Sequence, residues 1–218
     1  MHSLAEENYL KGLFHLANEA GEVGVNDLSR HLGIKMPTVN SMVKKLSEKG
    51  LVFYESYRPL RLTDKGRTEA ALIIRKHRLT EMFLVEKMGF GWDSVHEIAE
   101  QVEHIQAPEF FEKMDELLGY PKADPHGSPI PDKDGRMPSV DHIRLSECKA
   151  GDTIKLATVT HSSQDFLRYL SSRNLSLGVV MKVMSIEAYD GSMVVRYSGH
   201  TAETLSKSAC NALLVQKL

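Results

Sequence analysis

The chain has 218 residues, and its 29 acidic and 27 basic side chains give a formal net charge of −2, so any nucleic-acid surface has to be a local patch. Contents of 42% hydrophobic and 26% charged residues are typical of a soluble globular protein, and no stretch approaches the roughly 20 apolar residues of a membrane span. The N-terminus lacks the apolar core of a signal peptide, and the two cysteines, Cys148 and Cys210, lie far apart. We therefore expect a cytoplasmic protein with free thiols and no membrane partner.

Residues 1–63 have the pattern of a winged helix-turn-helix domain. Apolar residues recur at helical spacing in a first helix that Gly21 ends, in "VNDLSRHL", where Asn26 or Asp27 is the expected cap, and in "MPTVNSMVKKLSEK". Two short apolar runs flank Ser-Tyr-Arg-Pro in "LVFYESYRPLRLT", which predicts a two-stranded β wing. In this arrangement the second helix of the helix-turn-helix pair lies in the major groove of DNA, and the wing contacts the backbone.

The local charge favours DNA binding by this domain. Between residues 35 and 61 the chain has six basic residues and only two acidic ones. We expect phosphate contacts from the basic residues of the recognition helix and the wing, namely Lys44, Lys45 and Arg58. We expect contacts with base edges from three short polar residues, Thr38, Asn40 and Ser41. Pro37 opens the helix, and the amides of Thr38 and Val39, without a capping side chain, suit a phosphate. A winged helix used for protein contact is the alternative.

Residues 64–120 predict a helical domain with acids and imidazoles at helical spacing. A long helix that starts at Asp64 contains "HRLTE", in which His77 and Glu81 lie one turn apart. The stretch "HEIAEQVEHIQ", in a helix starting at Asp93 or Ser94, places four polar side chains on one face: His96, Glu100, Glu103 and His104. A hairpin of these two helices would bring six nitrogen and oxygen donors together. Grouped carboxylates repel one another, and a divalent cation such as manganese, iron or zinc removes that repulsion.

Three other interpretations of these acids and imidazoles stay open at this point. The pairs one turn apart are also typical of exposed helix surfaces, where each stabilises the helix by a few tenths of a kcal/mol. A zinc hydrolase is the second, although Glu100 stands where the HExxH pattern requires its second histidine. A pH sensor built from histidines is the third.

Beyond residue 120 the pattern changes. Residues 121–140 hold five prolines, and this composition predicts a linker that builds no core. Short alternating strands follow in "DTIKLATVT", in "GVVMKVMSIEAYDGSMVVRYSG" with an Asp190-Gly191 turn, and in "ALLVQKL", while "SQDFLRYLSSRN" predicts one helix. A small barrel over residues 141–218 fits this pattern. The predicted fold is therefore mainly α with a β-rich C-terminal domain.

The winged helix, "RKHRLTEMFLVEKMGFGWDSVHEIAEQVEHI" and "DPHGSPIP" together resemble the diphtheria-toxin-repressor family of iron- and manganese-dependent transcriptional regulators. The resemblance covers nearly the whole chain and is to the long form, which ends in an SH3-like domain akin to that of ferrous-iron transport accessory proteins. It implies a metal-dependent repressor that catalyses nothing. It also implies a homodimer through residues 64–120 that binds double-stranded operator DNA when Mn(II) or Fe(II) is bound, and that controls metal uptake genes.

The resemblance also implies two metal sites. Carried over by position, the primary site consists of Asn8, Glu100, Glu103 and His104. The ancillary site consists of His77, Glu81, His96 and, from the third domain, Asp165.

The types of donor at these positions bear on which metal the protein binds. Iron-type members place a sulfur ligand at the positions of Asn8 and Glu100, which here offer only harder donors, so we expect Mn(II) first, Fe(II) next and Zn(II) third. Manganese-type members, however, usually carry Asp at the position of Asn8, and short ones carry Glu at the position of Lys11. Two rivals remain: a winged-helix regulator that senses a small organic ligand, and a metal-dependent hydrolase that uses the same cluster.

Overall fold

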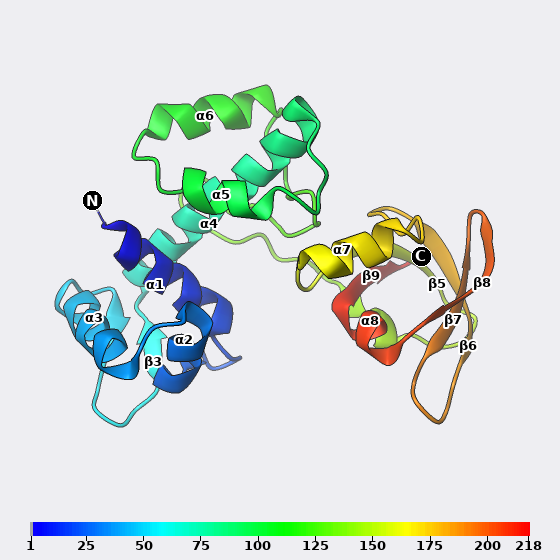
Figure 1. Ribbon diagram of the computed structural model, residues 1–218, viewed down its shortest axis with the longest axis horizontal. Coiled ribbons are helices and arrows are strands. Elements are labelled where there is room, and N and C mark those ends of the chain that lie inside the picture. Colours follow the sequence, from blue (N-terminus) through cyan, green and yellow to red (C-terminus); the bar gives the residue numbers. More distant parts are fainter. Residues whose placement is uncertain (1) are drawn as a thin grey trace. The chain divides into compact units, whose positions relative to one another are not determined.

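The computed structural model describes residues 2–218, which form two compact units (Figure 1). Unit 1 comprises the described residues up to Thr80 together with Ala99–Gly119 and Ile130–Pro138. Unit 2 comprises Glu81–Ile98, Tyr120–Pro129 and Ser139–Leu218. The boundary falls within two helices, so each of those helices contributes residues to both units.

Unit 1 begins with the predicted winged helix-turn-helix. Its elements are α1 (Leu4–Leu16), β1 (Glu22–Val23), α2 (Val25–Leu32), α3 (Met36–Glu48), β2 (Val52–Phe53) and β3 (Leu60–Leu62). The three strands form one antiparallel sheet in the order β1-β3-β2, so the wing has a third strand that the sequence did not predict. The N-cap of α2 is Gly24, without a side-chain hydrogen bond, so the prediction of Asn26 or Asp27 as the cap is wrong.

The helices of this domain start and stop where local chemistry dictates. Ser3 and Glu6 form a reciprocal capping box at the start of α1, which satisfies two of its free amides. Gly33 ends α2 in the left-handed conformation, with φ at 65°. The domain encloses one core of buried aliphatic residues together with Tyr9, and its members include Leu10, Leu13, Leu28, Val39, Val43, Leu46, Leu51 and Leu60.

Three further helices follow: α4 (Asp64–Met88), α5 (His96–Val102) and α6 (Pro108–Leu117). Helix α5 begins at His96, later than the predicted Asp93 or Ser94, and Glu103 and His104 lie in the turn that follows it. The amide of Glu103 still donates to the carbonyl of Ala99, 2.9 Å away, so the turn keeps the helical direction. The predicted face of acids and imidazoles therefore extends past the helix itself.

Unit 2 contains a six-stranded antiparallel sheet in the order β4-β9-β5-β6-β7-β8. The strands are β4 (Ile143–Arg144), β5 (Thr153–Val159), β6 (Val180–Ile186), β7 (Met193–Tyr197), β8 (His200–Leu205) and β9 (Leu213–Lys217). The turn η1 (Leu145–Glu147) and the helices α7 (Gln164–Ser171) and α8 (Lys207–Ala212) accompany them. Of these elements, β4, β8, η1 and α8 were not predicted.

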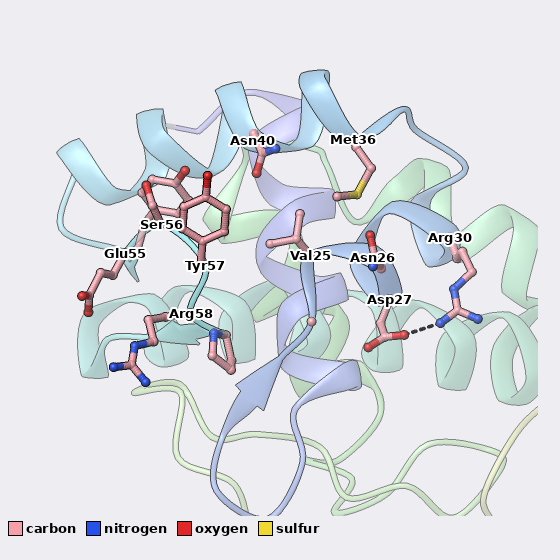
Figure 2. A pocket seen from close by; sticks show the side chains of 13 residues that line it. Val25, Asn26, Asp27, Arg30, Met36, Asn40, Glu55, Ser56, Tyr57 and Arg58 are labelled. Atoms are coloured by element: carbon pink, nitrogen blue, oxygen red, sulfur yellow. Dashed lines mark hydrogen bonds and ion pairs between the residues drawn. The ribbon is translucent and has the colours of Figure 1, made fainter.

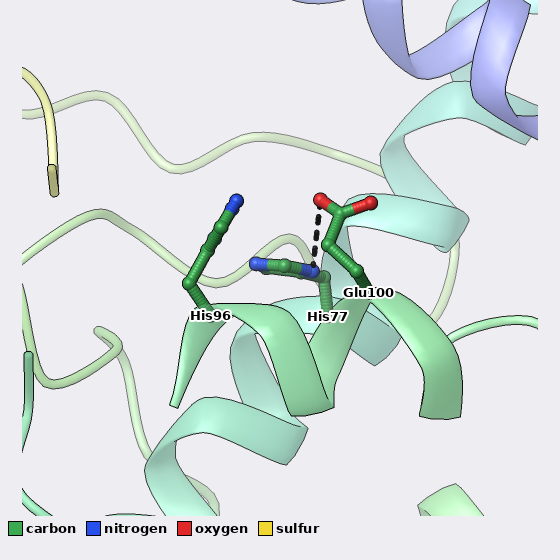
Figure 3. Close-up of side chains that lie close together, drawn as sticks. All are labelled: His77, His96 and Glu100. Carbon is green, nitrogen blue, oxygen red and sulfur yellow. Dashed lines mark ion pairs between the residues drawn. The ribbon is translucent and has the colours of Figure 1, made fainter. Parts of the chain in front are cut away.

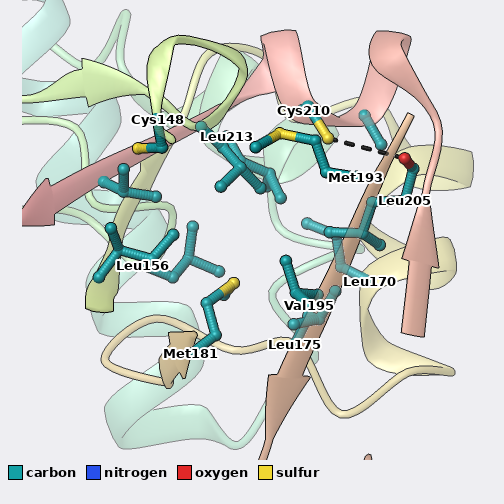
Figure 4. Close-up of a cluster of buried hydrophobic side chains, with 14 of the residues drawn as sticks. Cys148, Leu156, Leu170, Leu175, Met181, Met193, Val195, Leu205, Cys210 and Leu213 are labelled. Atoms are coloured by element: carbon teal, nitrogen blue, oxygen red, sulfur yellow. Dashed lines mark hydrogen bonds between the residues drawn. The ribbon is translucent and has the colours of Figure 1, made fainter. Parts of the chain in front are cut away.

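The sheet of unit 2 encloses a second apolar core, part of which Figure 4 draws. Both cysteines are buried in it as free thiols, as expected. Burial raises the pKa of the Cys210 thiol to about 11, and its Sγ lies 3.7 Å from the carbonyl oxygen of Leu205. Cys210 therefore acts here as a small apolar residue. Among the described residues, no helix is both long and apolar enough to cross a membrane.

The proline-rich segment is folded, contrary to the prediction of a linker without a core. Ile130 and His126 are each 3% exposed, and Ala123 pairs with Pro129 in an isolated antiparallel bridge. Gly127 packs against β5 with φ at 85°, and a Cβ at this position would lie 2.1 Å from the carbonyl oxygen of Ala157. Only glycine fits this approach of two backbones, which holds the preceding His126 beside the sheet.

Candidate metal centre and nucleic-acid interface

A group of buried and half-buried acids, imidazoles and one lysine lies in unit 1, and we call it the unit 1 cluster. Its members come from α1, from α4 and from α5 with its following turn: Glu7, Lys11, His77, Glu100, Glu103 and His104. Glu103 is 0% exposed and lies at the centre of the group. Its Oε2 lies 2.5 Å from Nδ1 of His77, and its Oε1 lies 3.5 Å from Nε2 of His104.

His104 is held in one orientation by an acid of α1. Its Nδ1 lies 2.6 Å from Oε2 of Glu7, and Glu7 also accepts a hydrogen bond from Nε2 of Gln106 at 2.8 Å. A carboxylate accepts hydrogen bonds, so Nδ1–H of His104 donates to Glu7, and Nε2 is the ring nitrogen on the side of Glu103. Glu7, which the sequence interpretation missed, thus prepares His104 to bind a cation through Nε2.

Asn8 is the predicted ligand from α1. Its Oδ1 is buried and has no hydrogen-bond partner among the described residues. A buried amide oxygen without a donor costs free energy unless something else satisfies it. Asn8 lies three residues before Lys11 on α1, and this spacing places the two on one side of the helix. A buried oxygen without a donor is what a site for an oxygen-seeking cation requires, and the role of Asn8 as a ligand stays a prediction.

The donors of the unit 1 cluster fit a divalent cation. Glu100 and Glu103 supply carboxylate oxygens, His104 supplies a prepared nitrogen, and Asn8 supplies an unsatisfied amide oxygen. This set has no sulfur and is typical of sites for manganese, ferrous iron or zinc. Lys11 lies among the same acids, with Nζ 2.5 Å from Oε1 of Glu100 and 2.7 Å from Oε1 of Glu103.

A second candidate site, which we call the unit 2 cluster, consists of Glu81, Asp124 and His126. All three are buried, and each offers a ligand atom within 4.8 Å of the others. Nδ1 of His126 lies 3.5 Å from Oε2 of Glu81 and 4.0 Å from Oδ1 of Asp124. Asp124 and His126 lie in the proline-rich segment and were not predicted as ligands.

Backbone contacts position the unit 2 cluster. Oδ1 of Asp124 accepts hydrogen bonds from the amides of His126 and Ser128 at 2.8 and 2.9 Å, which turns the chain tightly. Nε2 of His126 donates to the carbonyl oxygen of Trp92 at 2.7 Å, so Nδ1 is the nitrogen that faces the acids. Burial lowers the pKa of His126, but the adjacent carboxylates of Glu81 and Asp124 outweigh it and raise the pKa overall.

Two members of the predicted ancillary set, His77 and Glu81, have different recorded partners. His77 contacts Glu103 of the unit 1 cluster, whereas Glu81 belongs to the unit 2 cluster, where Nδ1 of His96 lies 3.4 Å from its Oε1. Figure 3 shows His77 beside Glu100, with 3.9 Å between Nδ1 and Oε1, and draws His96 one turn before Glu100 on α5. Asp165 is exposed on the first turn of α7 and is not a member of the unit 2 cluster. The ancillary assignment stays a prediction.

The predicted DNA-binding residues lie on α3 and the wing. Thr38, Ser41 and Lys44 are exposed on α3, as is Pro37 at its start. Asn40 and Arg58 line a groove of about 720 Å³ between α2, α3 and the wing (Figure 2). Two amides expected to be free are not, because Thr38 and Val39 both donate to the carbonyl oxygen of Lys35. A phosphate therefore has to be held by the side chains.

Lys45 has a partner inside the DNA-binding domain. Its Nζ lies 3.0 Å from Oε1 of Glu6, and Nζ of Lys49 lies 2.6 Å from the same oxygen. Hydrogen bonds from these two lysines lower the pKa of the Glu6 carboxyl to about 2. Glu6 thus fastens α3 to α1, and Lys45 is the one predicted phosphate ligand for which the structure records an ion pair.

The chain is similar to known proteins over nearly its whole length. Three family models match: "Iron dependent repressor, N-terminal DNA binding domain" over residues 1–60, "Iron dependent repressor, metal binding and dimerisation domain" over residues 63–132, and "FeoA domain" over residues 143–217. The iron-dependent repressor IdeR of Mycobacterium tuberculosis (strain ATCC 25618 / H37Rv) is 30% identical over 227 residues, covering 97% of this chain and 96% of that protein.

Solved structures are similar over the same length. A manganese-dependent transcriptional repressor in complex with manganese has a TM-score of 0.87 and 32% identity, and the match covers 98% of this chain and 100% of that one. The structure of ScaR with bound Zn²⁺ has a TM-score of 0.80 and 31% identity, and the match covers 98% of this chain and 99% of that one.

The fold and the buried donor clusters define a metal-dependent transcriptional repressor that binds DNA, with a dimerisation domain and a β-rich C-terminal FeoA domain, and not an enzyme. The chain belongs to the iron-dependent repressor family. It is similar to IdeR and to a diphtheria toxin repressor over most of their length. Its residues offer sites for divalent metal ions.

Proposed function

We propose that the unit 1 cluster is the switch of this repressor, with Mn(II) as its first candidate ion, Fe(II) next and Zn(II) third. The observation that carries the proposal is the meeting of α1 with α5 and its following turn at buried Glu103. Helix α1 belongs to the DNA-binding domain, and α5 lies in the segment matched by the dimerisation model. Ligands on both elements can therefore transmit occupancy of the cluster to the orientation of the DNA-binding domain.

The residues act as follows. Glu100, Glu103 and Nε2 of His104 would hold the ion from the side of α5, Glu7 keeps His104 oriented, and Oδ1 of Asn8 would be the ligand from α1. When bound, the ion supplies a positive charge that joins these donors. Asn8 and Glu100 would thereby fix α1 relative to α5. In a homodimer formed through residues 64–120, the two DNA-binding domains would then lose less conformational freedom when they dock on operator DNA.

The preference for manganese rests on the donors. Carboxylate, imidazole and amide groups are hard or borderline ligands, and neither cluster includes a sulfur atom. ScaR has been solved with Zn²⁺ and another relative with manganese, so the fold accommodates both ions. The regulated genes are proposed to serve metal uptake, and the site of action to be the cytoplasm, where the operator DNA lies.

In unit 2, we propose that Glu81, Asp124 and His126 hold the ancillary ion, with His96 beside Glu81. On the DNA, we propose that Lys44, Lys45 and Arg58 contact phosphates and that Thr38, Asn40 and Ser41 reach base edges next to Pro37. Lys45 can do so only by sharing its charge with Glu6. The half-sites are expected to lie about one helical turn of DNA apart, or a multiple of it.

The test is a selection of binding sites from random double-stranded DNA by a chelated sample, repeated with Mn(II), anaerobic Fe(II) or Zn(II). We expect a pseudo-palindromic sequence to emerge with metal, and affinity for it to rise with Mn(II) at the lowest concentration. Equal binding to that sequence by the chelated protein would refute metal control. A preference for Fe(II) would leave the switch in place and reverse the order of metals.

A further inference from the structure

The outer face of the sheet in unit 2 carries a row of basic side chains. Among the described residues of β5, β6 and β7, the exposed positions include no acid and no aromatic residue, but three basic residues that we call the basic stripe: Lys155, Lys182 and Arg196. Each adjoins in sequence a residue of the apolar core that Figure 4 draws, namely Leu156, Met181 and Val195. Because side chains alternate along a strand, the basic stripe points away from the core.

The register of the strands places these cations close together. Lys182 lies directly opposite Arg196 in the antiparallel pair of β6 and β7. Residues in this relation have Cβ atoms about 4.5–5.5 Å apart, and like charges there are destabilising. Lys155 lies diagonally from Lys182, because its own partner on β6 is Val180. The sheet therefore holds three positive charges side by side at a cost to its own stability.

The basic stripe keeps its charge available. In the part of the chain that the structure describes, none of its three members has a recorded salt bridge, whereas the acids nearby in sequence do. Asp152 contacts Nζ of Lys217 at 2.7 Å. Glu203 contacts Nε of Arg173 at 3.0 Å and lies opposite the core residue Val195, so it belongs to the other face of the sheet. An anion from outside the chain is the partner that this face lacks.

From this face we infer that the basic stripe is a second DNA contact of the repressor, one that binds phosphates of the duplex irrespective of base sequence. The inference goes beyond the contacts proposed for α3 and the wing, and it does not rest on the metal switch. DNA is the polyanion that this chain binds through its first domain. Lysine and arginine side chains that neutralise phosphates add sequence-independent affinity.

Phosphates fit this face better than an acidic protein surface does. Protein interfaces are depleted of lysine and take their binding energy from aromatic and apolar anchors, and the exposed positions around the basic stripe offer no aromatic residue. Beside the stripe lie Thr153 and Gln216, each paired with one of its lysines. Hydroxyl and amide side chains of this kind join lysine and arginine in contacts with the DNA backbone.

The test is binding of the full chain, at saturating Mn(II), to two duplexes of equal length over a range of salt concentrations. One duplex contains the selected operator and the other an unrelated sequence, and fluorescence anisotropy measures both. The variants are Lys182→Gln and a triple variant in which all three members of the basic stripe become Gln. Lys182→Arg keeps the charge, and Lys122→Gln removes an exposed lysine of unit 2 that lies outside the sheet.

We expect Lys182→Gln to reduce the slope of log K against log salt by about one, and the triple variant to reduce it by about two to three. Phosphate contacts carry no sequence information, so the triple variant should lose the same factor, at least about tenfold at about 100 mM salt, on both duplexes. Lys182→Arg and Lys122→Gln should keep the slope of the parent. The melting temperature of the triple variant should be no lower than that of the parent, because opposed like charges are removed.

Parent-like affinity and slope of the triple variant on both duplexes would overturn the inference, and an acidic protein would then be the anion that fits this face. A loss confined to the operator duplex would overturn it too, because it would indicate an indirect effect on base recognition. Failure of the proposed metal switch is a separate result, in which Mn(II) does not strengthen operator binding by the parent. The unrelated duplex still tests the basic stripe in that case.

Discussion

In unit 1, the carboxylates of Glu100 and Glu103 contact Lys11, whereas in unit 2 Glu81 and Asp124 face His126. The unit 1 cluster joins three separate helices, one of which belongs to the DNA-binding domain. The unit 2 cluster joins α4 to a turn packed on β5, where the amide of Val159 donates to the carbonyl oxygen of His126 at 3.1 Å. Similar donors thus connect different parts of the molecule, and their effects on DNA binding should differ accordingly.

The largest effect should come from Glu103→Gln. This change keeps the shape of the side chain but removes the charge at the centre of the unit 1 cluster. We expect metal-dependent affinity for the selected operator to fall by about 100-fold, within the usual range of coupling between sites. Fluorescence anisotropy with labelled operator measures it, and Glu112→Gln on the exposed face of α6 is the matched control. A normal response of Glu103→Gln to Mn(II) would remove Glu103 from the switch.

His126→Ala should have a smaller effect on DNA binding, because the unit 2 cluster contains no residue of the DNA-binding domain. We expect the variant to lose one Mn(II) per protomer and to bind operator about tenfold more weakly at saturating Mn(II). Metal analysis and anisotropy on one preparation give both numbers, and His161→Ala, at an exposed position of unit 2, is the control. An effect as large as that of Glu103→Gln would mean that the two clusters act as one coupled centre.

The smallest effect concerns Glu6, the neighbour of Glu7 that faces α3 and not the cluster. Its pKa is lowered to about 2, so the stability that its ion pairs supply is present above pH 4.5 and is lost as the pH falls from 4.5 toward 2. We expect Glu6→Gln to lower the free energy of unfolding at pH 7 by about 1–2 kcal/mol, less than the full shift implies because Lys45 and Lys49 are 54% and 40% exposed.

Urea unfolding at pH 7 and pH 3 checks this prediction. The difference in stability between the parent and Glu6→Gln should shrink at the lower pH, and Mn(II) affinity should stay the same in both. Loss of Mn(II) binding would mean that Glu6, and not only Glu7, supports the unit 1 cluster.

The sequence predicted the helices and the recognition element because their apolar spacing is local, although α1 ends at Leu16, before the Gly21 that was expected to end it. It missed β1, which has two residues, and α8, which has six, because such short elements leave no period to read. Composition also misled for residues 121–140, since the proline content hid the turn of Asp124 that buries His126. In this segment, hydrogen bonds of backbone amides to Asp124 shape the chain, and no apolar period indicates them.

The contacts that the site residues make with one another were harder to predict than the identity of those residues. The spacing of His77 and Glu81 placed them on one helix face, but their separate partners depend on how α4 packs against other segments. Glu7 and Asn8, neighbours on α1, show the same limit of sequence-based prediction. Carrying positions over from a family does not reveal that Glu7 contacts His104 or that Oδ1 of Asn8 has no hydrogen-bond partner. The contacts of Lys11 with two distant acids likewise depend on the tertiary fold.

The central claim is that donors on α1 and on α5 with its following turn convert occupancy of the unit 1 cluster into a DNA-binding shape, and Asn8→Ala tests it most directly. Calorimetry with Mn(II) and anisotropy with operator are measured on the same preparation. Because Glu100, Glu103 and His104 remain, we expect Mn(II) affinity to fall less than about tenfold, while the metal-dependent gain in operator affinity falls by more than about tenfold. If Asn8→Ala binds operator as tightly as the parent at saturating Mn(II), coupling through α1 by this residue is contradicted.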